Sequence, residues 1–187
     1  MTVRETSVPG LLVIEPRVFE DARGFFLERY HAGRYAEAGI PGPFVQDNHS
    51  RSVQGTLRGL HFQRRHPQGK LVECVRGRIW DVAVDLRAGS PTFGAWEGVE
   101  LDEASHRQLW VPPGFAHGFG VLSDTADVLY KCTEVYHPGD EGGVAWDDPD
   151  LGIPWPVDIP LLSDKDAAWP RLEALGADAL PVASFSS

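Results

Sequence analysis

Residues 79–86 have the sequence IWDVAVDL, in which large apolar side chains alternate with small or acidic ones. Successive side chains of a β-strand point to opposite faces, so this stretch predicts a strand with two different environments. One face would carry Trp80, Val82, Val84 and Leu86, and the other Asp81, Ala83 and Asp85. A strand that is apolar on one face and acidic on the other needs a core on its first side and polar partners on its second.

Short runs of the same kind lie on both sides of this stretch. The chain contains 20 Gly and 15 Pro residues, which favour many turns and short strands over long helices. The further strands expected are 11–19, 24–30, 71–75, 94–101, 108–111, 118–122 and 128–136. Closely spaced strands separated by turns predict an antiparallel sandwich or a small barrel.

The rest of the chain is expected to support this barrel. Short helices are predicted at 33–39 and at 163–168, the second with Ser163 as its cap. We expect a single domain over residues 1–187, with a barrel core at about 45–137 and a C-terminal segment, 138–187, that packs on the barrel.

The charge pattern limits the possible partners. The net charge of −10 argues against a nucleic-acid binder or a binder of anionic membranes. Residues 1–80 nevertheless carry 12 Lys and Arg against 8 Asp and Glu, so a phosphate-bearing ligand should meet this half. No apolar run reaches 18 residues and the N-terminus lacks an apolar signal core, which predicts a cytoplasmic protein. Cys74 and Cys132 are then expected to be buried thiols.

A cupin signature is present in part. Residues 112–119 read PPGFAHGF and contain the Pro-x-Gly-x-x-His half of that two-part pattern, ending at His117. Upstream, Gly55 and His61 fit the spacing of the other half, but Gln63 stands where the second His belongs. No Glu lies three or four residues beyond Gln63, and no Asn follows His117 at the expected distance. Of four metal ligands only His61 and His117 remain, and two imidazoles rarely hold a metal tightly. The pattern predicts an all-β, cupin-type jelly-roll barrel with a cavity and no metal. A metal-dependent cupin oxygenase is the alternative that bound iron would support.

Arg58 and His61 are candidates for inward-facing groups because they lie between hydrophobic positions. They are three residues apart, so a regular strand would send them to opposite faces. If both serve one site, Gly59 should mark a β-bulge. The alternative is a surface strand on which both side chains are solvated.

Three further groups could carry chemistry. Lys70 shares a strand face with small apolar residues, and Tyr130 lies on another predicted strand. Each also has a purely structural interpretation, as a strand-end lysine or a packing aromatic. A carboxylate in the segment LSDKD at 162–166 could fix the tautomer of His61, and the spacing leaves Asp164 and Asp166 equally open.

Collinear segments over nearly the whole chain resemble the dTDP-4-dehydrorhamnose 3,5-epimerase family. They are DARGFFLE at 21–28, QDNHS at 46–50, LRGLHFQ at 57–63, KLV at 70–72, DVAVDLR at 81–87 with SPTFG at 90–94, PGFAHGF at 113–119 and LSDKD at 162–166. The resemblance implies a metal-free, cofactor-free jelly roll that forms a homodimer and takes dTDP-4-keto-6-deoxyglucose as its substrate.

The resemblance also implies roles for individual residues. His61 matches the general base, Asp166 its partner, Tyr130 the proton donor on the opposite face of the sugar, and Lys70 the group near the C4 oxygen. Matches to substrate and nucleotide contacts, some of them reaching over from a partner subunit, are Arg23, Glu28, Gln46, Asn48, Arg58, His117, Glu141 and Lys165.

The implied chemistry agrees with these residue types. Protons at C3 and C5 flank the C4 ketone, so their removal gives an enolate whose charge a lysine can stabilise. No redox step is involved, and no Gly-x-Gly-x-x-Gly sequence for a nicotinamide cofactor occurs. Two alternatives remain: a mono-epimerase of an antibiotic-sugar pathway that inverts C3 or C5 alone, and a non-catalytic sugar-nucleotide binder.

Overall fold

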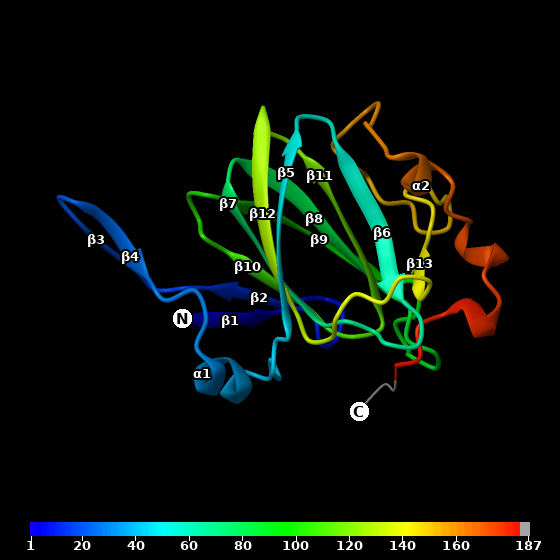
Figure 1. Cartoon of the computed structure of the whole chain (residues 1–187), viewed down its shortest axis with the longest axis horizontal. Coiled ribbons are helices and arrows are strands. Elements are labelled where there is room, and N and C mark those ends of the chain that lie inside the picture. Colours follow the sequence, from blue (N-terminus) through cyan, green and yellow to red (C-terminus); the bar gives the residue numbers. More distant parts are fainter. Residues whose placement is uncertain (184–187) are drawn as a thin grey trace.

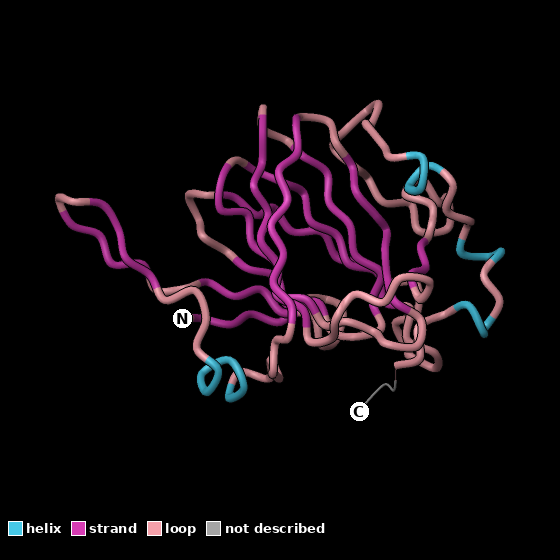
Figure 2. The backbone as a smooth tube through the Cα atoms, viewed as in Figure 1, coloured by secondary structure: helices cyan, strands magenta, loops and turns pink. Residues whose placement is uncertain are grey.

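The computed structural model describes residues 1–183, and its framework is two antiparallel sheets (Figures 1 and 2). The first sheet has the order β1-β2-β10-β7-β12-β5 and the second the order β13-β6-β11-β8-β9. The strands of the first sheet are Thr2–Glu5, Leu12–Glu15, Gln108–Val111, Lys70–Arg76, Thr125–Cys132 and Gln46–Val53. Those of the second are Glu141–Gly143, Leu57–Gln63, Phe115–Val121, Arg78–Asp85 and Trp96–Asp102. The predicted all-β fold is confirmed.

Strand β8 has the two environments that its alternating sequence predicts. Ile79 and Ala83 point between the sheets into the larger core cluster, whereas Val82 and Val84 belong to a second cluster on the other side of the strand. Asp81 also points inward and is fully buried. The inner face of β8 therefore contributes both to the core and to a polar site.

The C-terminal segment covers the outer face of the second sheet as far as Ala183. Ile153, Trp155, Leu172 and Leu175 pack against the cluster that contains Val82 and Val84. This segment holds α2 (Asp164–Ala167) and two short 3-10 helices, Leu172–Ala174 and Ala177–Ala179, which lie on the side of β6 and β13 (Figure 1). Burial of apolar area stabilises this arrangement at roughly 25 cal/mol per Å². The division into a core at about 45–137 and a C-terminal segment stays a prediction, and strands β1 and β2 extend the first sheet before residue 45.

A separate hairpin projects away from the sandwich (Figure 1). Among the strands described in residues 1–183, β3 (Val18–Asp21) and β4 (Gly24–Leu27) pair only with each other. The predicted strands 11–19 and 24–30 thus extend too far, because the first divides into β2 and β3. Helix α1 (Ala32–Glu37) follows the hairpin and is capped by the side chain of His31.

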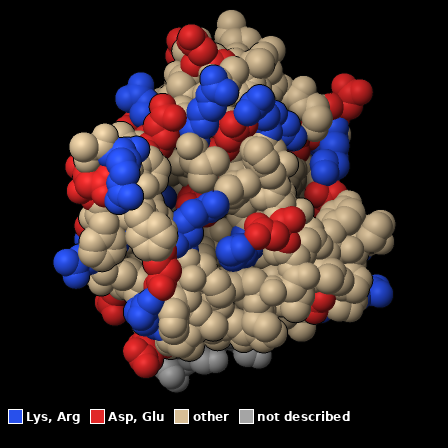
Figure 3. Space-filling view, turned by 60° about the vertical axis from the view of Figure 1, so that its left-hand side comes forward, with Lys and Arg blue, Asp and Glu red and all other residues tan. Residues whose placement is uncertain are grey.

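Acidic and basic side chains are interspersed on the face shown in Figure 3. The excess of basic residues in the first half of the chain thus forms no single large patch on this face. Cys74 and Cys132 are buried free thiols, as predicted. Among residues 1–183, no helix is both long and apolar enough to span a membrane.

Candidate active site

A cavity of about 380 Å³ opens between the two sheets. Strands β5, β7 and β12 contribute side chains from the first sheet, and β6, β11 and β13 from the second. Its lining residues are Gln46, Asn48, Ser50, Arg58, His61, Phe62, Gln63, Gln68, Lys70, His117, Gly118, Phe119, Tyr130, Tyr136, Glu141 and Lys165. Of the predicted site residues, the structure brings together all except Asp166, Arg23 and Glu28 along this lining.

A β-bulge in β6 lets Arg58 and His61 face the same cavity. On the neighbouring strand β11, His117 pairs with His61 and Phe119 pairs with Arg58, so three steps along β6 match two along β11. Gly59 lies in this interval with φ of +127°, and a Cβ there would come within 2.5 Å of the Gly118 Cα. The bulge predicted at Gly59 is therefore confirmed, and only glycine fits it.

The partner of His61 is Asp166. Nε2 of His61 contacts Oδ1 of Asp166 in a short hydrogen bond, whereas Asp164 is exposed at the start of α2. The Ser163 hydroxyl donates to Oδ2 of Asp166 over 2.9 Å. Burial alone would raise the pKa of Asp166, but the hydrogen bonds from His61 and Ser163 outweigh it and lower that pKa. Asp166 is thus held as a carboxylate, which fixes the orientation of the imidazole.

A second imidazole, His117, lies beside the first on the neighbouring strand. Its Nε2 is 2.9 and 3.0 Å from the two carboxylate oxygens of Asp81 on β8. Both residues are buried, so this pair is shielded from water. His117 is therefore fixed from behind by Asp81, in the same way as His61 is fixed by Asp166.

Lys70 begins β7 and faces the cavity from the first sheet. Desolvation lowers the pKa of its ammonium group, and Cys132, Asp81 and Glu141 partly offset this effect. The chain has three lysines, and within residues 1–183 Lys131 and Lys165 each pair with a carboxylate whereas Lys70 does not. A partly buried cation without a paired anion is suited to stabilise negative charge on a ligand.

Tyr130 lies on β12, next to β7 in the same sheet, and its side chain packs against the core. Burial raises the pKa of its phenol, so the hydroxyl stays protonated at neutral pH. No other group in residues 1–183 forms a hydrogen bond with this hydroxyl. Tyr130 therefore presents a free proton donor from the sheet opposite His61.

Polar side chains near the mouth of the cavity are linked to one another. Gln46 donates to Asn48 over 3.0 Å and accepts from the backbone N–H of Tyr136. Glu141 accepts two hydrogen bonds from Lys165, over 2.8 and 3.0 Å. Arg58 lines the cavity and uses Nε to donate to Ser52, which leaves its two terminal nitrogens available to a ligand.

Arg23 and Glu28 lie outside this cavity. Arg23 pairs with Asp21 at the tip of the projecting hairpin, and Glu28 pairs with Arg34. Both are exposed. Within one chain the structure thus does not bring these two predicted ligand contacts to the other site residues.

The donor set does not suit a metal ion. Gln63 uses its side-chain amide to bind the backbone of His66, Val135 and His137. Among residues 1–183 no group of three or more His, Cys, Asp or Glu side chains is arranged to hold a metal.

Comparison with known proteins identifies the family of this chain. The sequence model of dTDP-4-dehydrorhamnose 3,5-epimerase matches residues 5–174. The chain belongs to this epimerase family. Membership makes the protein an isomerase, as the resemblance in the sequence implies.

Relatives of the epimerase match it over most of their length. The dTDP-4-dehydrorhamnose 3,5-epimerase of Methanothermobacter thermautotrophicus is 53% identical over 171 residues, which are 90% of this chain and 92% of that protein. A dTDP-4-dehydrorhamnose 3-epimerase of Streptomyces niveus is 46% identical over 184 residues, or 97% and 89% of the two chains.

A solved structure confirms the cupin-like fold. The epimerase of Legionella pneumophila, crystallised with dTDP-4-keto-L-rhamnose, superposes with a TM-score of 0.95 at 50% identity. The match covers 98% of this chain and 99% of that one.

Several groups at the epimerase site were not predicted from the sequence. Ser50 follows Gln46 and Asn48 on the inward face of β5, and its buried hydroxyl has no hydrogen-bond partner among residues 1–183. The alternation of side chains along a strand over residues 46–50 could have predicted that Ser50 shares a face with Gln46 and Asn48. Asp81 faces inward in the predicted alternation of β8, but nothing in the sequence pairs it with His117. Nothing in the sequence predicts that Trp169 lies at this site, where the centre of its ring is 6.0 Å from that of His61.

Proposed function

We propose that this epimerase inverts both C3 and C5 of dTDP-4-keto-6-deoxy-D-glucose and so forms dTDP-4-keto-L-rhamnose. The observation that carries the proposal is that a carboxylate-paired imidazole, His61, and a protonated phenol, Tyr130, enter one cavity from opposite sheets. A base and an acid on opposite sides of a flat enolate are what inversion at carbon requires.

Each inversion consists of two proton transfers. His61 removes the proton at C3 or C5, and the electron pair of the broken C–H bond moves to the C4 oxygen as an enolate. Tyr130 then donates its phenolic proton to the carbon from the other face. The tyrosinate regains a proton from solvent, and His61 releases one. No electrons leave the sugar, so the step needs no oxidant or reductant.

Lys70 supports the enolate in this proposal. Its ammonium group lies at the start of β7 and carries positive charge into the cavity, where a well-placed donor contributes roughly 3–4 kcal/mol to transition-state stability. His117, fixed by Asp81, is the second polar group available to the sugar. Asp166 holds His61 in the orientation in which the ring nitrogen away from Asp166 acts as the base.

The remaining cavity residues are suited to the nucleotide. Arg58 has a planar guanidinium that can bind a phosphoryl group in two places, and Gln46 and Asn48 offer amides beside it. Glu141 and Lys165 lie at the mouth of the same cavity.

We further propose a homodimer in which the hairpin of one chain reaches the cavity of its partner. In the described part of the chain the hairpin pairs with no other strand, and Phe25 and Phe26 on it are 61% and 69% exposed. Large apolar side chains exposed on a projecting arm are typical of an interface. Arg23 and Glu28 on or next to this arm would then reach the nucleotide of the partner subunit.

The second candidate is inversion at C3 alone, favoured by the 46% identity with the 3-epimerase of Streptomyces niveus. Both reactions use the same base and acid, so the position of the sugar decides between them. The experiment is to incubate the enzyme with dTDP-4-keto-6-deoxyglucose in D2O and to locate deuterium by NMR. Label at C3 and C5 supports the double epimerase, and label at one carbon supports the mono-epimerase.

A further inference from the structure

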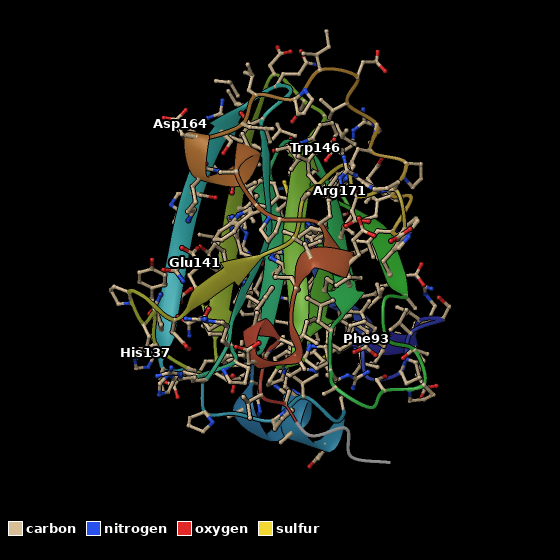
Figure 4. All side chains as sticks on the ribbon, turned by 90° about the vertical axis from the view of Figure 1, so that its right-hand side faces the viewer. Phe93, His137, Glu141, Trp146, Asp164 and Arg171 are labelled. Carbon is tan, nitrogen blue, oxygen red and sulfur yellow. The ribbon has the colours of Figure 1, made fainter. Side chains whose placement is uncertain are left out.

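Two links join the short helix α2 to the edge of the second sheet. Asp166 contacts His61 on β6, and the preceding residue, Lys165, holds both carboxylate oxygens of Glu141 on β13. Strands β13 and β6 are neighbours in the sheet (Figure 4), with Glu141 opposite Gln63 and Gly143 opposite His61. Adjacent residues of the helix are therefore bound to adjacent strands.

The position of α2 on the second sheet depends on such contacts, because the helix has only four residues. A helix of one turn is not stable by itself, since too few hydrogen bonds offset the ordering of its backbone. The side chain of Ser163 caps its first turn. Trp169 follows, and its ring fills the space above Gly143, where a Cβ would come within 2.3 Å of the indole.

The Glu141–Lys165 pair is better held than most surface ion pairs. The side chain of Glu141 is only 18% exposed, and the hydroxyl of Tyr136 lies 3.4 Å from the same carboxylate. Exposed pairs contribute little because both side chains must be ordered out of solvent. Here Glu141 is the better-ordered partner, because it lies on β13 and is largely buried, whereas the Lys165 side chain is 50% exposed.

We propose that the Glu141–Lys165 pair is a positioning clasp that holds Asp166 against His61. The inference rests on the proposed function, in which His61 is the base. Lys165 and Glu141 would act through Asp166 and not on the sugar. Without the clasp α2 shifts on the sheet edge, and the imidazole loses its fixed orientation.

The competing role is direct contact with the ligand, because both residues also line the mouth of the cavity. The two roles affect different kinetic constants. A ligand contact lowers affinity and raises KM, whereas a positioning residue lowers kcat for the same bound substrate. Lys165→Met removes the positive charge of the ion pair, and Glu141→Gln removes its negative charge. Lys165→Arg keeps the positive charge.

Steady-state kinetics on these variants form the first arm of the test. We expect Lys165→Met and Glu141→Gln to lower kcat about tenfold, with KM changed less than about twofold, and Lys165→Arg to recover most of the loss. Arg171→Met is the matched control, because Arg171 pairs with Asp147 in the same C-terminal segment and, within residues 1–183, forms no hydrogen bond or ion pair with His61 or Asp166. A raised KM with kcat unchanged overturns the clasp.

NMR of the ligand-free enzyme forms the second arm and needs no substrate. The imidazole ¹H and ¹⁵N signals of His61 should be those of a ring bonded to a carboxylate in wild type, Lys165→Arg and Arg171→Met. They should be shifted or broadened in Lys165→Met and Glu141→Gln, at unchanged thermal unfolding. Identical His61 spectra in all variants overturn the clasp. A wild-type enzyme without turnover refutes the proposed function, and the NMR arm still decides the clasp.

Discussion

His61 and Tyr130 face one cavity from two different sheets. His61 lies on β6 of the second sheet and Tyr130 on β12 of the first. The sandwich therefore keeps the two groups apart by its own thickness, and a sugar between them meets one on each face. Sheet packing thus provides the geometry that inversion at carbon needs.

Loss of the acid should separate proton exchange from inversion. In Tyr130→Phe, His61 can still remove a proton and return a deuteron from D2O to the same face. We expect kcat for epimerisation to fall about 10²–10⁴-fold while deuterium still enters the unreacted sugar. NMR of the recovered substrate measures both. Equal loss of exchange and inversion would contradict the role of Tyr130 as donor.

Lys70→Met should weaken catalysis and stabilise the fold. We expect kcat/KM to fall about 10²–10³-fold, because the enolate loses its cation. At pH 7 the Tm should rise by about 2–4 °C, the effect of about 1 kcal/mol in a domain of this size, because a desolvated charge is gone.

The pH dependence of this gain has a definite sign. Burial lowers the pKa of Lys70 in the folded protein below its ordinary 10.5. The unfolded chain then binds more protons than the folded protein at any pH between this lowered pKa and 10.5, so the wild type gains stability as the pH rises through that range. The difference in Tm between wild type and Lys70→Met should therefore narrow from pH 7 to pH 10. A lower Tm for Lys70→Met at pH 7 would show that the lysine stabilises the fold.

Gly59→Ala should destabilise the protein far more than Gly55→Ala. Both glycines have positive φ, but an added Cβ meets Gly118 at Gly59 and meets nothing within 4 Å at Gly55. We expect a loss of about 1–2 kcal/mol at Gly55 from the backbone alone. At Gly59 the loss should exceed about 3 kcal/mol, since strain and the steric clash combine. Urea denaturation of both variants measures the difference in the free energy of unfolding. Equal losses would show that the bulge at Gly59 does not require glycine.

The proposed dimer predicts complementation between two defective chains. A double variant, Arg23→Ala with Glu28→Ala, should bind substrate weakly, and His61→Ala should not turn over. Co-expressed with different tags, they should regain about a quarter of the wild-type activity at low substrate, because half of the dimers carry one intact site.

The matched control for this experiment pairs His61→Ala with Lys70→Met. Both changes lie in the cavity of their own chain, so every site in the mixed dimer is defective and no activity should return. If dimers form and neither mixture regains activity, Arg23 and Glu28 do not act across the interface.

Parts of the site followed from the sequence because they rest on local rules. Alternation along β8 predicts its two faces, and the three-residue spacing of Arg58 and His61 requires the bulge at Gly59. The choice between Asp164 and Asp166 did not follow from spacing. The family resemblance favoured Asp166, and it is the Asp166 carboxylate that contacts His61 in the structure, because the fold brings this distant segment to β6.

Other elements were not predicted for a physical reason. Strand β5, which contains residues 46–50, carries polar side chains on both faces, since one faces the cavity, and so lacks hydrophobic alternation. Strand β13 is only Glu141–Gly143, and its two glycines have low strand propensity. It forms because it pairs with β6. The predicted strand 128–136 ends at Cys132, and the chain then turns towards the mouth of the cavity.

The most direct test is incubation with dTDP-4-keto-6-deoxyglucose in D2O, followed by NMR and mass spectrometry of the sugar, with His61→Ala beside the wild type. The wild type should incorporate deuterium at both C3 and C5 and invert both centres. His61→Ala should show no exchange and should still bind dTDP. Exchange in His61→Ala at a rate within about tenfold of the wild type would contradict the assignment of His61 as the base.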